Sequence, residues 1–335
     1  MTEFFYDYSG FLAKSVTLVI LLLALFAGLI AIISRGKELA KEKLEITNLN
    51  DKFKEMRLNL NSEVLDKDSL KKWIKEEKKQ SKASKKSPDN EKGRVFVLNF
   101  HGDIKASALE SLREEITAII TIANDKDEVV VKLESGGGMV HAYGLASSQL
   151  IRLRQANIPL TISIDKVAAS GGYMMACVAN KILAAPFAIV GSIGVIAQIP
   201  NFNRLLRNHD IDFEQMTAGE FKRTLTMFGE NTDKAREKFK DELEDTHALF
   251  KDFITEHRPQ VKIDQVATGE HWLATRAINF ALIDELCTSD DYLLQKSQHN
   301  DVFEIKYTIK KSIGSRMGLL AQSTFENLFL KTPHP

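Results

Sequence analysis

Three glycine-rich segments hold the residue types that acyl-transfer chemistry needs. They are Ser135–Met139 (SGGGM), Ala168–Tyr173 (AASGGY) and Gly191–Val195 (GSIGV). In the second, Ser170 is followed by two glycines, so nothing crowds the approach to its hydroxyl if it opens a helix. The N–H groups of the first turn of that helix would be free to bind a developing oxyanion. The alternative is an ordinary N-cap serine, which has the same pattern. An isolated Ser-Gly-Gly is usually a helix cap and not a nucleophile.

The first glycine run offers a second source of N–H donors. No Lys-Ser/Thr pair follows Gly136–Gly138, so the run is not a phosphate-binding P-loop. A tight turn from strand to helix is the simplest explanation of the run. If its strand lies beside the strand before Ser170, one of its N–H groups would face the serine hydroxyl.

A nucleophilic serine also needs a base. Three of the eight histidines, His101, His141 and His247, are candidates for a Ser-His-Asp triad, but none has a distinctive sequence context. Lys222 is the other candidate. A lysine has an ordinary pKa near 10.4, so it serves as a base near neutral pH only where desolvation favours the neutral amine.

The elements that position these residues follow from the hydrophobic pattern. Short apolar runs at 94–100, 129–133 and 160–164 predict buried strands, and amphipathic stretches at 108–122 and 143–153 predict helices between them. This alternation predicts an α/β domain with a parallel sheet, whose carboxyl strand ends share one edge. A longer helix is predicted over 233–257, with Thr232 as its N-cap.

Composition limits the classes of protein. The chain has 335 residues, enough for about two domains. Its 45 basic and 45 acidic residues cancel, which gives no basic field for nucleic acid. Cys177 and Cys287 are too few for a zinc cluster, and Cys177 is expected simply to pack in the interior.

A membrane anchor is predicted near the start. Residues 15–34 carry no charge and, as a helix, would span about 30 Å, the thickness of the bilayer's hydrocarbon; residues 1–14 form an aromatic-rich flank. A cleaved signal peptide is the alternative. The apolar run is longer than such a signal needs, and Glu3 and Asp7 precede it, which favours a retained anchor.

A charged tether, partly helical, is expected over 35–92, which holds 17 basic and 12 acidic residues. Its lysine-rich stretch at 71–86 is interpreted as a solvated spacer, with attraction to anionic lipids as the alternative. The excess of lysine after the anchor predicts that the folded body lies in the cytoplasm. The tail at 310–335 has a weaker pattern, with a short amphipathic helix expected over 317–330.

These segments together resemble the signal peptide peptidase A family of membrane-anchored serine proteases. The resemblance covers about 94–284 and rests on the three glycine segments, on the lysine in Glu220–Leu225 (EFKRTL) and on the Leu-Ile-Asp at 282–284. It implies a ClpP/crotonase fold over a protease domain at 93–309, with a Ser/Lys dyad and no cofactor or metal. Ser170 would be the nucleophile, Lys222 the general base, and Ser192 the hydroxyl that orients the lysine.

The resemblance also implies an oxyanion hole and an assembly. Gly137 and Gly171 match the oxyanion donors. Gly136 stands where the family usually has proline, and Ala281 where it usually has glycine. Members form homo-oligomers at the bacterial inner membrane, cut peptide or protein substrates such as signal-peptide remnants, and place their catalytic body outside the cytoplasm. The side of the membrane therefore stays open.

Two other functions fit the same residues. Acyl-CoA chemistry of the crotonase type would explain the glycine turns but gives the serine and lysine no role. A non-catalytic membrane adaptor would need neither side chain. Peptidase turnover and labelling of Ser170 by a serine-reactive probe separate the three.

Overall fold

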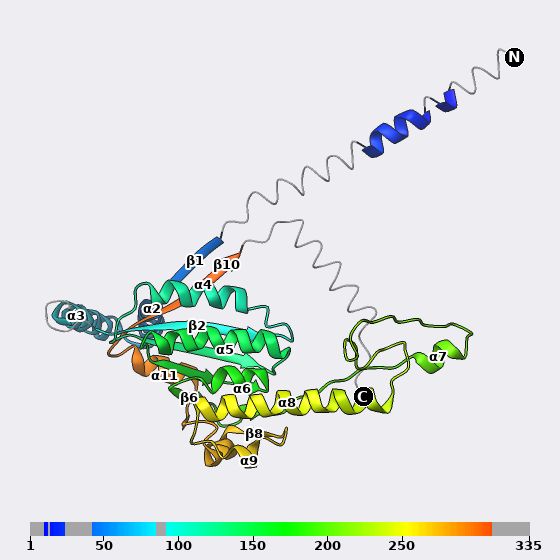
Figure 1. Cartoon of the computed structure of the whole chain (residues 1–335). Helices are drawn as coiled ribbons and strands as arrows, with labels where there is room; N and C mark the ends of the chain where they lie inside the picture. The colour runs from blue at the N-terminus through cyan, green and yellow to red at the C-terminus, as the bar shows by residue number, and fades with distance from the viewer. Residues whose placement is uncertain (1–9, 13, 24–41, 85–91, 310–335) are drawn as a thin grey trace. The chain divides into compact units, whose positions relative to one another are not determined.

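The computed structural model describes residues 10–12, 14–23, 42–84 and 92–309. The last two of these ranges contain one largely parallel β-sheet (Figure 1). The main row of strands runs in the order β1-β10-β2-β3-β4-β6-β9. The bounds of these strands are β1 Glu42–Asn48, β2 Arg94–Gly102, β3 Glu128–Ser135, β4 Leu160–Ile164, β6 Lys181–Ala184, β9 Glu285–Leu286 and β10 Asp301–Ile309. Neighbours from β10 to β9 pair in parallel.

Three short strands leave this row at the carboxyl end of β3. β5 (Val167–Ala169) pairs in parallel with β3 through Ser135 and Ala168, and also with β7 (Ile189–Gly191). β7 pairs antiparallel with β8 (His271–Leu273). This branch carries the chain away from the main sheet just where the three glycine segments lie.

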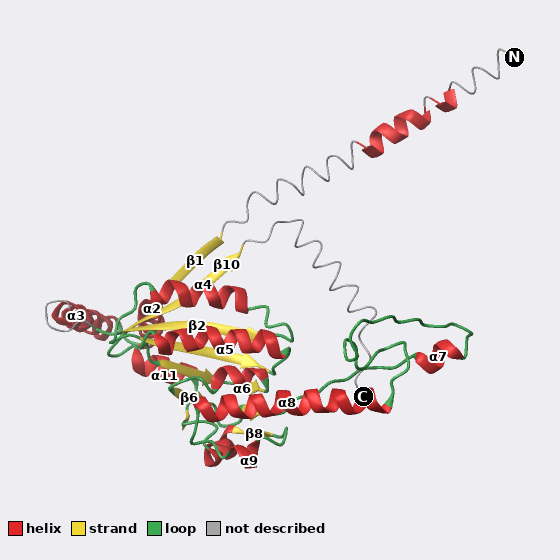
Figure 2. Cartoon of the chain, in the orientation of Figure 1, coloured by secondary structure: helices red, strands yellow, loops and turns green. Residues whose placement is uncertain are grey.

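Helices cover the sheet and connect its strands (Figure 2). Their bounds are α2 Leu49–Val64, α3 Lys67–Ser84, α4 Leu109–Ile120, α5 Val140–Gln155, α6 Gly171–Ala176, α7 Asn203–Arg207, α8 Asp233–His257, α9 Ile263–Val266, α10 Ala274–Ala277 and α11 Ser289–Lys296, with a 3-10 turn at Ile278–Phe280. Thr232 caps α8, as predicted, since its side chain accepts a hydrogen bond from the N–H of Ala235.

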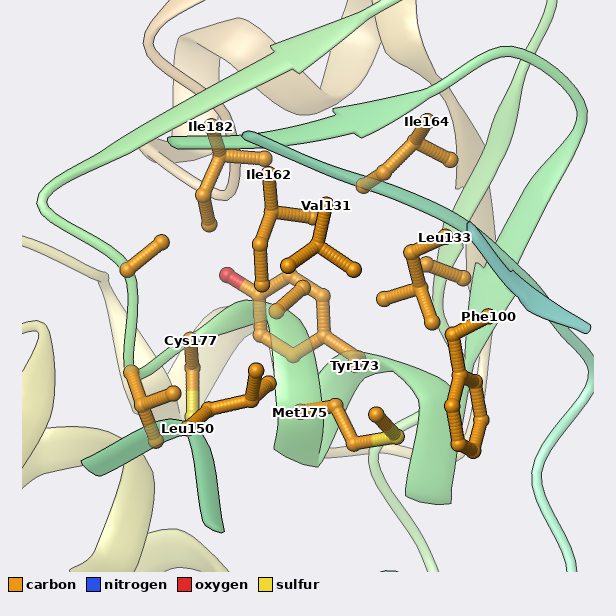
Figure 3. Close-up of a cluster of buried hydrophobic side chains, with 14 of the residues drawn as sticks. Phe100, Val131, Leu133, Leu150, Ile162, Ile164, Tyr173, Met175, Cys177 and Ile182 are labelled. Atoms are coloured by element: carbon orange, nitrogen blue, oxygen red, sulfur yellow. The ribbon is translucent and has the colours of Figure 1, made fainter. Parts of the chain in front are cut away.

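Two apolar cores form because strand side chains alternate between the faces of the sheet. The larger core includes Phe100, Leu133 and Ile162 together with Leu150 of α5 and Tyr173 of α6 (Figure 3). The smaller core lies on the other face. It contains Leu49, Val95, Val97, Val130, Leu183, Tyr292, Leu293 and Val302. The predicted α/β class, its three strands and its helices are thereby confirmed, while β1 and β10 were not anticipated.

Part of the segment expected to be a charged, partly helical tether contributes to the sheet and to its smaller core. It forms β1, α2 and α3, and Leu49 is buried in the smaller core. The Asn50 side chain donates to the carbonyls of Ser297 and Asn300 and accepts from the N–H of Val302. These three hydrogen bonds fix the start of α2 to the region between α11 and β10.

The predicted anchor is only partly described. Residues 14–23 are helical, whereas 24–34 lie outside the described residues, as does the tail at 310–335. Searching the described part of the chain finds no helix with the length and apolar character needed to cross a bilayer. The span over 15–34 therefore stays a prediction.

A lobe formed by residues 199–232, which includes α7, lies at the amino-terminal end of α8 (Figure 1). α8 buries only Phe250 and Ile254, both in its carboxyl-terminal half, so its first half projects beyond the sheet. Within the lobe only Gly229 is buried.

Candidate active site

Ser170 lies at the carboxyl end of β5 and at the N-cap of α6, in a backbone conformation unusual for serine. Its φ is 50° and its ψ is −119°, and its N–H donates to the carbonyl of Gly191 at 2.8 Å. The side chain makes no capping hydrogen bond to α6. A non-glycine residue with positive φ stores about 1–3 kcal/mol of strain, and such strain concentrates at functional sites. Ser170 therefore occupies the N-cap position without making the capping hydrogen bond of an ordinary N-cap serine.

The glycine turn after β3 lies directly against Ser170. Gly137 has φ +90°, and a Cβ placed there would stand 2.8 Å from the Cβ of Ser170 and 2.7 Å from the nitrogen of Gly171. Only glycine fits so close an approach. The two segments that were predicted to face each other across neighbouring strands do so.

The N–H groups of these two glycines differ in what they contact. Gly171 is the first residue of α6, whose opening N–H groups have no carbonyl of their own helix to bind. The N–H of Gly137 donates to the Oγ of Ser135 at 3.1 Å. The predicted second oxyanion donor therefore has a partner within the chain.

A buried tyrosine, which the sequence patterns did not single out, supports both glycines. The hydroxyl of Tyr143 donates to the carbonyl of Asp103 at 2.7 Å and accepts from Ser135 Oγ at 2.5 Å. A Cβ on Gly171 would stand 2.4 Å from the ring of Tyr143. Burial raises the pKa of Tyr143, so the hydroxyl stays protonated as a donor. The only sequence signal was a tyrosine on the buried face of a predicted helix.

Ser192 lies near Ser170. Its φ is also 50°, its N–H donates to the carbonyl of Glu270 at 2.7 Å, and its Oγ is 3.5 Å from the carbonyl of Gly269. Ser192 and Ser170 line one cavity together with the 136–138 turn. A second, more apolar cavity adjoins it. It is lined by Ser170, Met174 and Phe250.

Lys222 lies elsewhere. It is exposed on the lobe, where it lines a separate hollow with Phe213, Met216 and Phe228. The structure therefore brings Ser170, Ser192 and both glycines together but does not bring the predicted base to them within one chain.

Of the three histidines considered, one reaches the site. His101 is exposed and lies 3.7 Å from Glu134, and His141 is exposed at the start of α5. His247, on α8, lines the cavity that contains Ser170 and Ser192. Burial raises the pKa of the Cys177 thiol, as expected for a cysteine packed in the core.

Comparison with known proteins identifies the class to which this fold and site belong. Residues 3–150 match the family model "Peptidase family S49 N-terminal", and residues 152–302 match "Peptidase family S49". The chain belongs to peptidase family S49, which is the signal peptide peptidase A family.

Its similarity to particular relatives extends over nearly the whole chain. It is 47% identical to "Probable protease SohB" of Haemophilus influenzae over 96% of this chain and 94% of that one. It is also 47% identical to "Probable protease SohB" of Buchnera aphidicola from Acyrthosiphon pisum, over 97% and 96%. A solved structure, a lysine-to-alanine mutant of the 1510-N membrane-bound stomatin-specific protease with a substrate peptide, is 15% identical. It covers 68% of this chain and 99% of its own, with a TM-score of 0.44.

Proposed function

We propose that this chain is a serine peptidase that cuts peptide bonds through an acyl-enzyme formed on Ser170. The observation that carries the proposal is the conformation of Ser170, a strained serine with no capping hydrogen bond beside two closely approaching glycine turns. Membership of a peptidase family supports the reaction class. The arrangement of short strands around Ser170 fits the ClpP/crotonase fold.

The proposed mechanism uses a Ser/Lys dyad. Neutral Lys222, oriented by Ser192, takes the proton of Ser170 as the hydroxyl attacks the scissile carbonyl. The N–H groups of Gly171 and Gly137 bind the oxyanion, and the lysine then protonates the leaving amine. For this, the Gly137 N–H has to turn from Ser135 Oγ toward the substrate or be shared between the two. Water releases the acyl group.

The position of Lys222 favours a dyad that forms between copies. The lobe projects on α8 away from the sheet, and Lys222 lines a different hollow from the cavity of Ser170 and Ser192. The lobe also exposes an apolar surface, and such surfaces usually mark contacts between proteins. Among its exposed side chains are Phe202, Leu205, Ile211, Phe213, Met216, Phe221, Met227 and Phe228. We infer a homo-oligomer in which the lobe of one copy brings Lys222 to the Ser170 of its neighbour.

Substitution of the two dyad residues tests the function. The full chain should hydrolyse fluorogenic peptides and be labelled at Ser170 by a fluorophosphonate. Ser170→Ala should lose both properties, and Lys222→Ala should lose hydrolysis by at least about 100-fold, the lower end of a base's contribution. A Lys222→Ala variant with full turnover would remove the dyad from the mechanism. A wild-type protein that neither hydrolyses peptides nor is labelled at Ser170 would favour the acyl-CoA or adaptor function.

Substrates and location complete the proposal. An apolar cavity beside Ser170 fits peptides with apolar side chains, such as signal-peptide remnants or unfolded and membrane-derived segments. We propose that residues 15–34 hold the protein in the bacterial inner membrane. Digestion of spheroplasts by an added protease shows on which side the sheet domain lies.

A further inference from the structure

One face of α8 forms a wall of the site around Ser170. Thr246 and Phe250 line the apolar cavity, and His247 lines the cavity shared by Ser170 and Ser192. The Thr246 hydroxyl donates to the carbonyl of Glu242 at 2.7 Å, so Thr246 and Phe250 offer the cavity a methyl group and an aromatic ring. His247 is therefore the residue by which α8 presents a hydrogen-bonding ring to the cavity.

The imidazole of His247 has an unsatisfied nitrogen. Its Nε2 is shielded from solvent and has no hydrogen-bond partner within the described structure. Leaving a buried polar atom unpaired costs about 1–3 kcal/mol, so such atoms usually have a partner that completes them. The torsion that turns an imidazole ring is soft, so a small rotation lets Nε2 meet a group that enters the cavity.

Apart from the proposed nucleophile Ser170, the other polar side chains along this cavity already have partners within the chain. The glycines of the 136–138 turn have no side chains, and the Thr268 hydroxyl is bonded to Glu270 at 2.8 Å. Ser192 Oγ is directed to the carbonyl of Gly269. A peptide that lies across Ser170 has its own N–H and C=O groups to satisfy, and His247 can pair with either because a neutral imidazole both donates and accepts.

We propose that His247 is a substrate-positioning residue whose Nε2 forms a hydrogen bond with the main chain of the peptide held at Ser170. The inference rests on the proposed peptidase function, since it names a residue that aligns the peptide for attack. His247 takes no proton from Ser170 in this role. Its effect is on how tightly and in which register the peptide binds.

Two conservative substitutions provide the test. Gln places an amide near the position of Nε2, whereas Asn reaches only as far as Nδ1. We expect His247→Gln to keep peptide KM within about threefold of wild type. We expect His247→Asn to raise KM about tenfold, which is about 1.4 kcal/mol, with kcat changed less than twofold. Asp245→Asn, at an exposed position on the same helix, is the control and should change neither.

A binding measurement separates this proposal from the proposed function. In full-length protein carrying Ser170→Ala, the affinity for a labelled apolar peptide should fall about tenfold on adding His247→Asn but not on adding His247→Gln. Equal affinity in both double variants, or equal loss in both, would overturn the role of Nε2. If the wild-type protein neither hydrolyses peptides nor reacts with a fluorophosphonate, the peptidase function fails, while the binding comparison still decides the role of His247.

Discussion

Three contacts fix the backbone of Ser170 before any substrate arrives. Its N–H is bonded to Gly191, Gly137 lies against its side chain, and the next residue lies on the ring of Tyr143. The residue types of this constellation could be predicted from the sequence, because only glycine tolerates such close approach. Tyr143 could not, since nothing in its local sequence distinguishes it from other buried aromatic residues.

Substitution of two glycines should have opposite effects on stability. In Gly171→Ala the new Cβ would stand 2.4 Å from Tyr143, so we expect a loss of about 1–3 kcal/mol in unfolding free energy and at least a tenfold loss of kcat. Gly144→Ala, in the interior of α5 where a Cβ meets nothing within 4 Å, is the matched control. It should gain up to about 1 kcal/mol. Urea unfolding and peptide hydrolysis measure both; a stabilised Gly171→Ala would contradict the packing.

At the scale of elements, the hydrophobic pattern predicted the central strands and the longest helix, which carry much of the buried core. The strands β2, β3 and β4 and the helix α8 lie near their predicted bounds, because each strand is a mostly apolar run and the helix has a long amphipathic pattern. β1 and β10 were missed. β1 stands in a charged segment, and β10 alternates apolar and polar residues with its partners far away in sequence. Pairing between distant segments is not visible in a local pattern.

An ion pair at the start of the sheet gives a pH-dependent contribution to stability. Asp127, before β3, accepts hydrogen bonds from the backbone and side chain of Arg94 in β2 and from the N–H of Asn124. Burial acts to raise the pKa of Asp127, but these donors outweigh it and hold the pKa below its ordinary value. A carboxyl with a lowered pKa stabilises the fold above about pH 4 and loses this contribution as pH falls through its folded pKa.

Asp127→Asn should therefore destabilise the protein mainly near neutral pH. We expect a loss of about 1–3 kcal/mol at pH 7 that becomes smaller below pH 4, measured by urea unfolding at several pH values. Asp125→Asn, at an exposed position two residues earlier, is the control and should have little effect at either pH. A difference from wild type that does not depend on pH would refute the role of the charge.

At the scale of the whole molecule, the sequence supplies the two residues of the proposed dyad but not the place where they would meet. Ser170 and Lys222 are 52 residues apart, and no pattern between them shows that the intervening chain leaves the sheet as a lobe on α8. In the proposed mechanism, Lys222 reaches Ser170 through contacts between two copies of the chain, and a single sequence pattern does not reveal such contacts.

Mixing two inactive variants tests this arrangement. If Lys222 of one copy serves Ser170 of another, Ser170→Ala and Lys222→Ala proteins, unfolded and refolded together, should regain a measurable part of wild-type peptidase activity. Each variant refolded alone, at the same concentration, should stay inactive. Mixed samples that form oligomers of wild-type size and yet show no activity would place both residues of the dyad in one chain.

The length of the projecting half of α8 also sets the direction in which the lobe lies relative to the sheet. An α-helix advances about 1.5 Å and turns about 100° per residue, so inserting one residue before Phe250 would swing the lobe to another side of the helix. The stability of the sheet domain would change little, because Phe250 and Ile254, the buried residues of α8, follow the insertion. Insertions and deletions between Asp233 and Phe250 should therefore be rarer among natural relatives than changes of amino-acid type along the same stretch.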